Sequence, residues 1–211
     1  MSKFTPFAAN AFYAPTLLPA IEELLARGIT QAAIEAQLRR SLSDLRTPFM
    51  RMPLLMSRRF WSFAVEQSGD PSIGLAAGER FVSTATNGLT YLFDVAPSLQ
   101  SACAYFERFF PFFNGHFRTQ IVRHDGAVEL RFVDCGSVKS SPATTDYILV
   151  SVCSMLRRKF LASGVERDPI IGINLARPPA VDCHAHEQAL RAPVHWARPF
   201  NSVQLDAQLF V

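Results

Sequence analysis

Residues 117–133 read FRTQIVRHDGAVELRFV and largely alternate apolar with polar side chains on both sides of Asp125-Gly126. A period of two is typical of strands with one buried face, and an Asp-Gly pair is typical of the two-residue turn of a β-hairpin. The stretch therefore predicts an antiparallel hairpin with strands at about 117–124 and 127–133.

The residues after this hairpin predict the rest of a sheet and its covering helices. A long helix is expected from Thr144 to Ala162, with Thr144 or Thr145 as its cap and Gly164 as its stop. A buried strand, a short helix and an alternating strand follow, at 170–175, 182–190 and 203–210. This order is typical of an antiparallel sheet with helices on one face.

The residues before the hairpin predict helices. Leucines at three- and four-residue spacing form a helix that stops at Gly28, and Thr30 has the chemistry of an N-cap for the next one. Further helices are predicted at 54–67, 72–77, 89–93 and 98–113. We therefore expect an α+β fold in which a helical N-terminal subdomain, at about 1–114, packs on a small antiparallel sheet covered by helices, at about 115–211.

The composition restricts the class of protein. Of 211 residues, 49% are hydrophobic and only 18% are charged, whereas roughly 25% are charged in a soluble domain. This imbalance excludes disorder and favours a thick core, a buried cavity or a surface covered by a partner. The formal net charge of +3 comes from 21 basic and 18 acidic residues, too even a balance for a nucleic-acid footprint.

The cysteines and the N-terminus indicate the compartment. The four cysteines form no CxxC pair and stand at Cys103, Cys135, Cys153 and Cys183, which favours a reducing environment. The first residues lack the apolar core of a signal peptide, and no run of about 18 apolar residues predicts a membrane span. We expect a cytoplasmic protein without a membrane partner.

The first two predicted helices form a hairpin that invites comparison with a helix-turn-helix unit. A DNA-reading second helix needs exposed polar or basic side chains near its start. Gln31, Glu35 and Gln37 stand there, and the acidic residue faces the expected phosphate side. We interpret the pair as a packing unit, and direct DNA binding by residues 30–40 is kept as a third function class.

The most unusual local feature is the aromatic run Tyr105-Phe106-Glu107-Arg108-Phe109-Phe110-Pro111-Phe112-Phe113. Helical spacing gathers its phenylalanines on one broad face, which could pack in a core, line a pocket or contact a second subunit. For a pocket, the predicted ligand-binding residues are Tyr91, Phe106, Phe109, Phe110, Phe113, His116, Arg118 and Arg131. Such a pocket would take an apolar or amphipathic molecule, and the cationic members would suit a carboxylate on it.

Metal binding and catalysis find little support. Cys183-His184-Ala185-His186-Glu187 is the only cluster of possible metal ligands, but the two histidines point in nearly opposite directions on a helix. No nucleophile elbow, zinc-protease motif, phosphate-binding loop or dinucleotide fingerprint is present. His124, Asp134 and Asp146 could be imagined as a catalytic set, although His124-Asp125-Gly126 is more simply a turn. We predict no metal, no cofactor, no catalytic residue and no enzyme activity.

Four phrases resemble a known family when they are taken in order. They are Gly69-Asp70-Pro71-Ser72-Ile73-Gly74-Leu75, Gly88-Leu89-Thr90-Tyr91-Leu92, Ala96-Pro97-Ser98-Leu99-Gln100-Ser101-Ala102 and Ala192-Pro193-Val194-His195-Trp196-Ala197-Arg198-Pro199-Phe200-Asn201-Ser202-Val203. The set is similar to the N-terminal, arabinose-binding-type domain of AraC-family transcriptional regulators. The resemblance covers about Leu17 to Leu209.

The resemblance implies a function. In that family the domain senses a small molecule and mediates dimerisation, while a C-terminal region with two helix-turn-helix units binds DNA. This sequence ends at Val211, so we expect a piece of a regulator whose C-terminal DNA-binding domain is absent, rather than a free-standing sensor. The alternative function is a dimerisation-only module without an effector. A cupin-like barrel, which another branch of these regulators uses, would need more strands than the sequence predicts.

Overall fold

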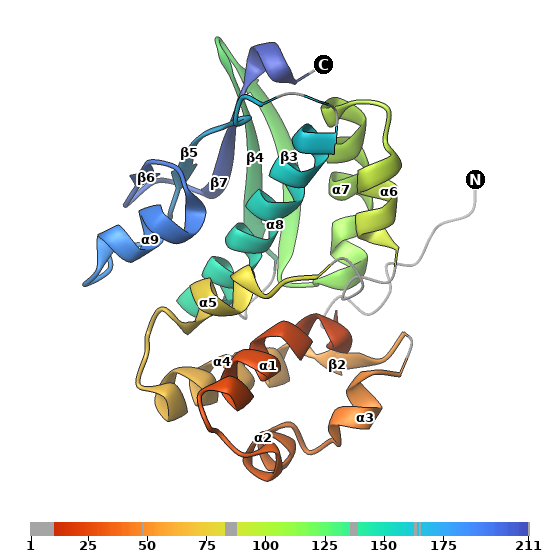
Figure 1. Ribbon diagram of the computed structural model, residues 1–211, viewed down its shortest axis with the longest axis vertical. Coiled ribbons are helices and arrows are strands. Elements are labelled where there is room, and N and C mark those ends of the chain that lie inside the picture. Colours follow the sequence, from red (N-terminus) through yellow and green to blue (C-terminus); the bar gives the residue numbers. More distant parts are fainter. Residues whose placement is uncertain are drawn as a thin grey trace.

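The hairpin forms one edge of the main sheet. In the computed structural model, which describes residues 11–47, 49–82, 88–135, 139–162, 164 and 166–210, strands β3 (Phe117–His124) and β4 (Ala127–Asp134) pair antiparallel (Figure 1). His124 lies opposite Ala127, so Asp125 and Gly126 are the two turn residues. The predicted hairpin is confirmed, with its turn in the expected place.

The sheet has five strands in the order β3-β4-β7-β5-β6. The three later strands are β5 (Ile170–Asn174), β6 (Val194–His195) and β7 (Asn201–Asp206). Neighbours are antiparallel except β5 and β6, which run parallel. Strand β6 was not predicted, because a strand of two residues carries no periodicity.

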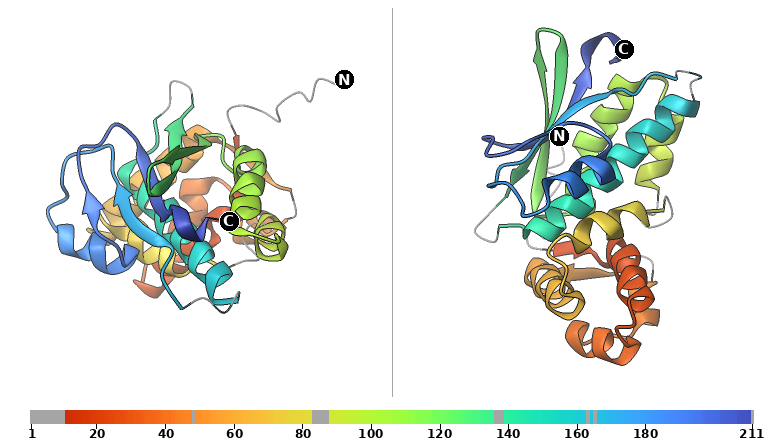
Figure 2. Two further views of the ribbon diagram at one scale, coloured as in Figure 1. Left: turned by 90° about the horizontal axis from the view of Figure 1, so that it is seen from above. Right: turned by 60° about the vertical axis from the view of Figure 1, so that its left-hand side comes forward.

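Helices cover one face of this sheet, as Figure 2 shows. Helices α7 (Leu99–Phe113), α8 (Pro142–Ala162) and α9 (Cys183–Leu190) contact its strands, and α6 (Leu89–Val95) packs on α7 and α8. Alternate residues of β4, namely Val128, Leu130 and Phe132, are buried toward the helices. The residues between them, Glu129 and Arg131, project to the other face, because successive side chains of a strand alternate.

The N-terminal helices form a second layer below the sheet in the view of Figure 1. They are α1 (Leu18–Ala26), α2 (Gln31–Leu38), α3 (Leu42–Leu45), α4 (Leu54–Ser68) and α5 (Ile73–Glu79). This layer also contains a two-stranded antiparallel ribbon of β1 (Ala11–Tyr13) and β2 (Arg51–Pro53). The 3-10 turn η1 (Ala14–Leu17) connects β1 to α1. Thr30 caps α2 as predicted, since its hydroxyl accepts from the Ala33 amide at 3.3 Å. The α+β prediction is confirmed.

Two predicted element ends are wrong. Helix α8 begins at Pro142, and the Ser141 hydroxyl accepts from the Thr144 amide at 3.2 Å. Ser141 therefore has the capping role expected of Thr144 or Thr145, both of which are buried inside the helix. The last predicted strand ends at Asp206, where its side chain caps the 3-10 turn η3 (Ala207–Leu209). A local capping bond stops the strand although the apolar alternation continues.

Helix α6 was predicted to be buried, but only one of its sides is. Phe93 is 1% exposed, but Tyr91 is 68% and Val95 55% exposed. A short helix at the surface buries one side alone, so a run of apolar residues does not establish burial all round.

Candidate ligand-binding site

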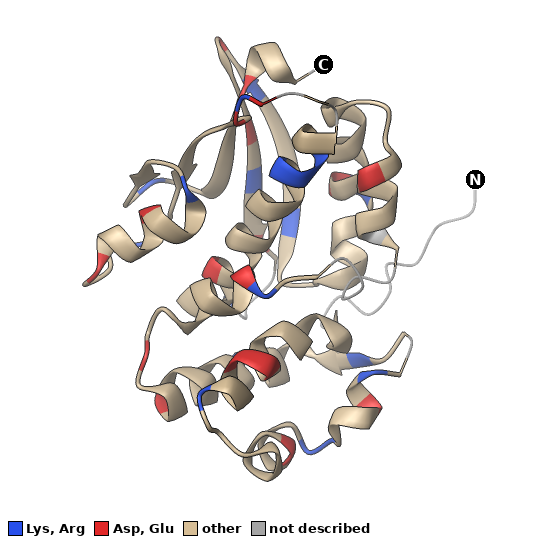
Figure 3. Cartoon of the chain, in the orientation of Figure 1, with Lys and Arg blue, Asp and Glu red and all other residues tan. Residues whose placement is uncertain are grey.

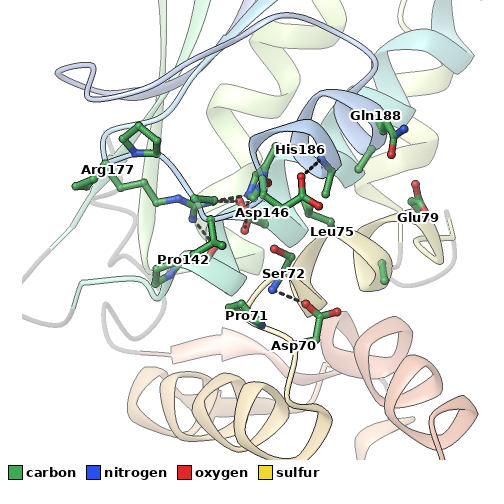
Figure 4. A pocket seen from close by; sticks show the side chains of 18 residues that line it. Asp70, Pro71, Ser72, Leu75, Glu79, Pro142, Asp146, Arg177, His186 and Gln188 are labelled. Atoms are coloured by element: carbon green, nitrogen blue, oxygen red, sulfur yellow. Dashed lines mark hydrogen bonds and ion pairs between the residues drawn. The ribbon is translucent and has the colours of Figure 1, made fainter.

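A cleft of about 770 Å³, shown in Figure 4, is named here the Arg177 cleft. It lies between α5, the start of α8, the segment that follows β5, and α9. Its apolar walls come from small side chains and prolines, including Pro71, Leu75, Ala76, Pro178, Ala185 and Ala189. The volume is within the range of about 300–1,000 Å³ that small-molecule sites occupy.

Two glycines set the distance between α5 and α8 at one side of the cleft. A Cβ atom added to Gly74 would lie 2.1 Å from the carbonyl oxygen of Ala143. A Cβ atom at Gly78 would lie 2.6 Å from Cβ of Val150. The two helices thus pack backbone against backbone, as small residues four apart allow. Leu75 and Ala76, next to Gly74, line the cleft.

Prolines shape the other side. The chain leaves β5 at Asn174 and reaches Pro178-Pro179 before α9 begins at Cys183. Proline has no amide hydrogen to donate to a neighbouring strand, so this segment cannot extend the sheet. Both prolines line the cleft, together with Ala180 and Val181.

A polar cluster of three side chains, two of them buried, forms the end of the cleft. Arg177 Nη2 donates to Asp146 Oδ1 at 2.5 Å, and Arg177 Nη1 donates to the carbonyl oxygen of Pro142 at 3.0 Å. Asp146 is 2% exposed and His186 1%. Because a buried carboxylate needs a charged or hydrogen-bonding partner, Arg177 links the segment after β5 to the first turns of α8.

The contacts of His186 connect α9 with its neighbours. His186 Nδ1 lies 3.1 Å from the carbonyl oxygen of Asp182, which can only accept, so Nδ1 donates there. Nε2 lies 2.9 Å from Arg177 Nη2 and 3.4 Å from Asp146 Oδ2. The Trp196 ring packs edge-on against the imidazole at a centroid distance of 5.0 Å. These contacts join α9 to Arg177 and to the last strands.

Two other acidic side chains at the cleft, Asp70 and Asp182, already accept hydrogen bonds from the protein. Asp70 accepts from Arg27 Nη1 at 2.9 Å and from the Ser72 amide at 2.8 Å. Asp182 accepts from the Ala185 amide at 3.0 Å and caps α9. Glu79 is exposed at the rim. The cleft thus combines apolar walls with a few oriented polar groups, as binding sites for small molecules do.

The structure brings together three of the residues predicted for the ligand site. Phe106, Phe110 and Phe113 line a cavity of about 50 Å³ between α7 and α8, which we name the aromatic seam. Phe106 and Phe110 stack with ring centroids 4.6 Å apart. They are 2% and 7% exposed, so these two rings pack as core. The cavity is smaller than that of known small-molecule sites.

The other predicted site residues lie elsewhere. His116 is buried beside Phe117, and Phe109 is half-buried under Arg108. Tyr91 is exposed on α6. Arg118 and Arg131 project from the sheet face opposite the helices, with Arg118 exposed and Arg131 paired with Glu129 at 2.7 Å. The cationic residues expected near the phenylalanines therefore do not line the seam.

The residues of the Arg177 cleft were considered for other chemistry or missed. His186 was weighed as a metal ligand and Asp146 as a catalytic residue, while Arg177 was overlooked. The sequence marked Arg177 only by its position, between a predicted buried strand and two prolines. Asp134 bonds to Ser140 and His124 to Glu129, so neither is joined to Asp146. Within the described ranges, no group of three candidate ligands could hold a metal ion.

Comparison with known proteins identifies the class and the family. The family model described as the arabinose-binding domain of AraC transcription regulators, N-terminal, matches residues 28–211. The chain therefore belongs to this family of regulatory domains, and the resemblance noted in the sequence is confirmed. A search of curated proteins gave no match.

A solved structure shares the fold. The crystal structure of the transcriptional regulator CdpR from Pseudomonas aeruginosa superimposes with a TM-score of 0.64 at 16% identity. The match covers 91% of this chain and 55% of that one, so the chain spans about half the length of that regulator. At this identity the likeness shows the fold. In the part of the chain that the structure describes, no helix is both long and apolar enough to cross a membrane.

Proposed function

We propose that this chain is the effector-sensing and dimerisation domain of an AraC-type transcriptional regulator, and that the Arg177 cleft holds the effector. The observation that carries the proposal is a cleft of about 770 Å³ whose end is built from Arg177 and its buried partners Asp146 and His186. DNA would be bound by a C-terminal domain attached to this one, as the family membership suggests.

The walls indicate an apolar or amphipathic effector. Proline, alanine and leucine side chains offer contact area without hydrogen bonds, and Arg177 contributes a cationic group at one end of the cleft. An amphipathic molecule would bury its apolar part between α5 and α9 and turn its polar group toward Arg177.

The location of the cleft suggests how binding would be transmitted. Helix α5 leads out of the N-terminal helical layer, whereas α9 belongs to the sheet layer (Figure 1). A molecule that contacts both would favour the arrangement in which they lie closest. It can change the equilibrium only through a difference in affinity between two arrangements, and a dimer would pass that difference to the attached domains.

The aromatic seam stays a second possible ligand site. Three of the eight predicted residues line it, and Tyr147 and Met155 of α8 are among the other lining residues. A ligand there would have to separate Phe106 from its neighbours, which costs packing energy. The cleft needs no such rearrangement, so we place the effector there.

One observation favours the dimerisation-only alternative. Helix α6 exposes Tyr91, Leu92 and Val95 at 68%, 39% and 55%. Neighbouring exposed apolar side chains can mark a contact with another subunit. Charged residues, by contrast, are scattered over both layers in the view of Figure 3 and do not gather as a DNA-binding stripe would.

The test begins with a thermal-shift screen of amphipathic metabolites against the purified chain. A ligand at a hundredfold excess over its Kd raises the stability of the folded state by about 3 kcal/mol. Each stabilising compound is then titrated calorimetrically into Gln188→Phe, which adds an aromatic ring at the cleft, and into Gln100→Phe. Gln100 is exposed on α7 and outside the cleft, so it is the matched control.

We expect binding to weaken by about tenfold or more in Gln188→Phe and to be unchanged in Gln100→Phe. Equal affinity in both variants would contradict the cleft as the site. Loss of affinity in Phe109→Ala and Arg118→Ala would instead assign the ligand to the residues first predicted. A dimer that no compound stabilises would support the dimerisation-only alternative.

A further inference from the structure

A separate cavity of about 290 Å³ lies on the sheet face opposite the helices, and we name it the sheet-face cavity. Glu129, Arg131, Asn174 and Gln204 line it from three neighbouring strands, and the strand register places all four on this face. The rest of its lining comes from Arg198, Pro199 and Phe200, in the segment before β7, and from His124 at the end of β3. It shares no residue with the Arg177 cleft or the aromatic seam.

A buried carboxylate forms the base of this cavity. Glu129 is 7% exposed, and its Oε1 accepts from Ser202 Oγ at 2.6 Å and from Asn174 Nδ2 at 3.2 Å. Its Oε2 accepts from Arg131 Nε at 2.8 Å. Burial alone would raise the pKa of Glu129, but hydrogen bonds from Ser202, Arg131 and His124 and the charge of Arg131 lower it to about 2. Glu129 is thus an ionised group whose oxygens are occupied.

The amide of Asn174 is left half satisfied. Its Nδ2 donates to Glu129 and, at 3.0 Å, to Ser202 Oγ. Its Oδ1 is buried and has no hydrogen-bond partner within the described residues. Turning the amide over would place Oδ1 against the Glu129 carboxylate, where two acceptors would face each other. The orientation is therefore fixed, and Oδ1 requires a donor from a bound molecule or a water.

The charges around the cavity favour an anion. Glu129 contributes one negative charge, and Arg131 and Arg198 contribute one positive charge each. Arg131 is paired with Glu129 and lies over the Phe200 ring at 4.7 Å. Arg198 is exposed at the rim, so the net positive charge is placed where an incoming ligand would meet it. A guanidinium suits carboxylate or phosphate oxygens.

We infer that the sheet-face cavity binds a small organic anion that also carries a hydroxyl or amino group. The anionic group pairs with Arg198, and the hydroxyl or amino group donates to Asn174 Oδ1. The cavity is at the lower end of the usual size of ligand sites, which suits a compact metabolite. The site lies on the other face of the sheet from the Arg177 cleft and does not depend on an effector there.

The experiment uses glycolate, which has a carboxylate and a hydroxyl, with acetate and ethylene glycol as probes that each lack one group. Each is titrated into the ¹⁵N-labelled chain, and the side-chain amide signals of Asn174 and Gln204 are followed. Arg198→Gln removes the rim charge. Arg118→Gln is the matched control, because Arg118 is exposed on the same face but outside the cavity.

We expect glycolate to shift both amide signals saturably and to bind about tenfold more tightly than acetate or ethylene glycol. Arg198→Gln should weaken glycolate binding by about tenfold, and Arg118→Gln by less than about twofold. Dispersed spectra of both variants show that they are folded. Absence of a saturable shift with glycolate, equal binding of acetate, or equal loss in the two arginine variants would overturn the inference.

Discussion

The aromatic seam and the Arg177 cleft are lined by different kinds of side chain and leave very different volumes open. The seam contains the densest aromatic run of the chain, yet its rings close on one another and leave about 50 Å³. The cleft is made from alanines, prolines and a few charges, and it encloses about 770 Å³.

The difference has a physical cause. Flat aromatic rings stack and fill space efficiently, so a run of them on one helix face tends to complete a core. An open cavity forms where backbone segments are fixed in position by contacts other than side chains that fill the space between them. Here that is the α5–α8 contact on one side and the proline segment, tied to α8 by Arg177, on the other.

The largest expected effect is in the seam. Phe106→Ala removes a ring that contacts Phe93, Phe110 and Phe132, so it should lower the free energy of unfolding by about 3–5 kcal/mol in urea denaturation. Phe112→Ala on the same helix is the control. Phe112 is 39% exposed, so its loss should cost about 1 kcal/mol or less. Equal losses would mean that the seam is not a packed core.

A smaller effect is expected at the glycine contact beside the cleft. In an exposed helix, glycine to alanine stabilises by about 1 kcal/mol. In Gly74→Ala the new methyl group would collide with the carbonyl of Ala143, so unfolding should become easier by about 2 kcal/mol. Differential scanning calorimetry measures the sign directly. A stabilised variant would show that α5 does not fix this side of the cleft.

The third effect is expected on the open face of the sheet and depends on pH, which tests whether this face is independent of both regions. Because each unit by which the folded pKa lies below the ordinary value corresponds to about 1.4 kcal/mol, Glu129→Gln should cost up to about 3 kcal/mol at pH 7. The folded pKa of Glu129 lies near 2, below the ordinary 4.5. Its stabilising effect is therefore complete above about pH 4.5 and lost as the pH falls toward 2.

Denaturation of the wild type and of Glu129→Gln between pH 6 and pH 3 measures this. The difference in unfolding free energy should shrink as the pH falls. A constant difference would mean that the Glu129 carboxylate is not held ionised by its partners.

Local signals predicted much of the fold. The Asp125-Gly126 turn, the Thr30 cap and the helical spacing of residues 99–113 each depend on neighbours in the sequence, and all three are found as expected. The cap of α8 was misplaced because Ser141, Thr144 and Thr145 have the same capping chemistry. Only the start of the helix distinguishes them.

The candidate site was less predictable, since its residues are distant in sequence. Asp146, Arg177 and His186 come from α8, from the segment after β5 and from α9. Taken alone, His186 suggested a metal ligand and Asp146 a catalytic residue, while Arg177 suggested no function. The aromatic residues were conspicuous, but their number could not show whether they surround a space or fill it.

The amino-acid sequence by itself determined the order of helices and strands, the main hairpin and the family, because periodicity, turn chemistry and ordered motifs are local properties. Tertiary structure alone decided where the chain is hollow. Cavity volume depends on how whole elements are spaced, and here a backbone contact at Gly74, a proline segment and one buried ion pair set that spacing.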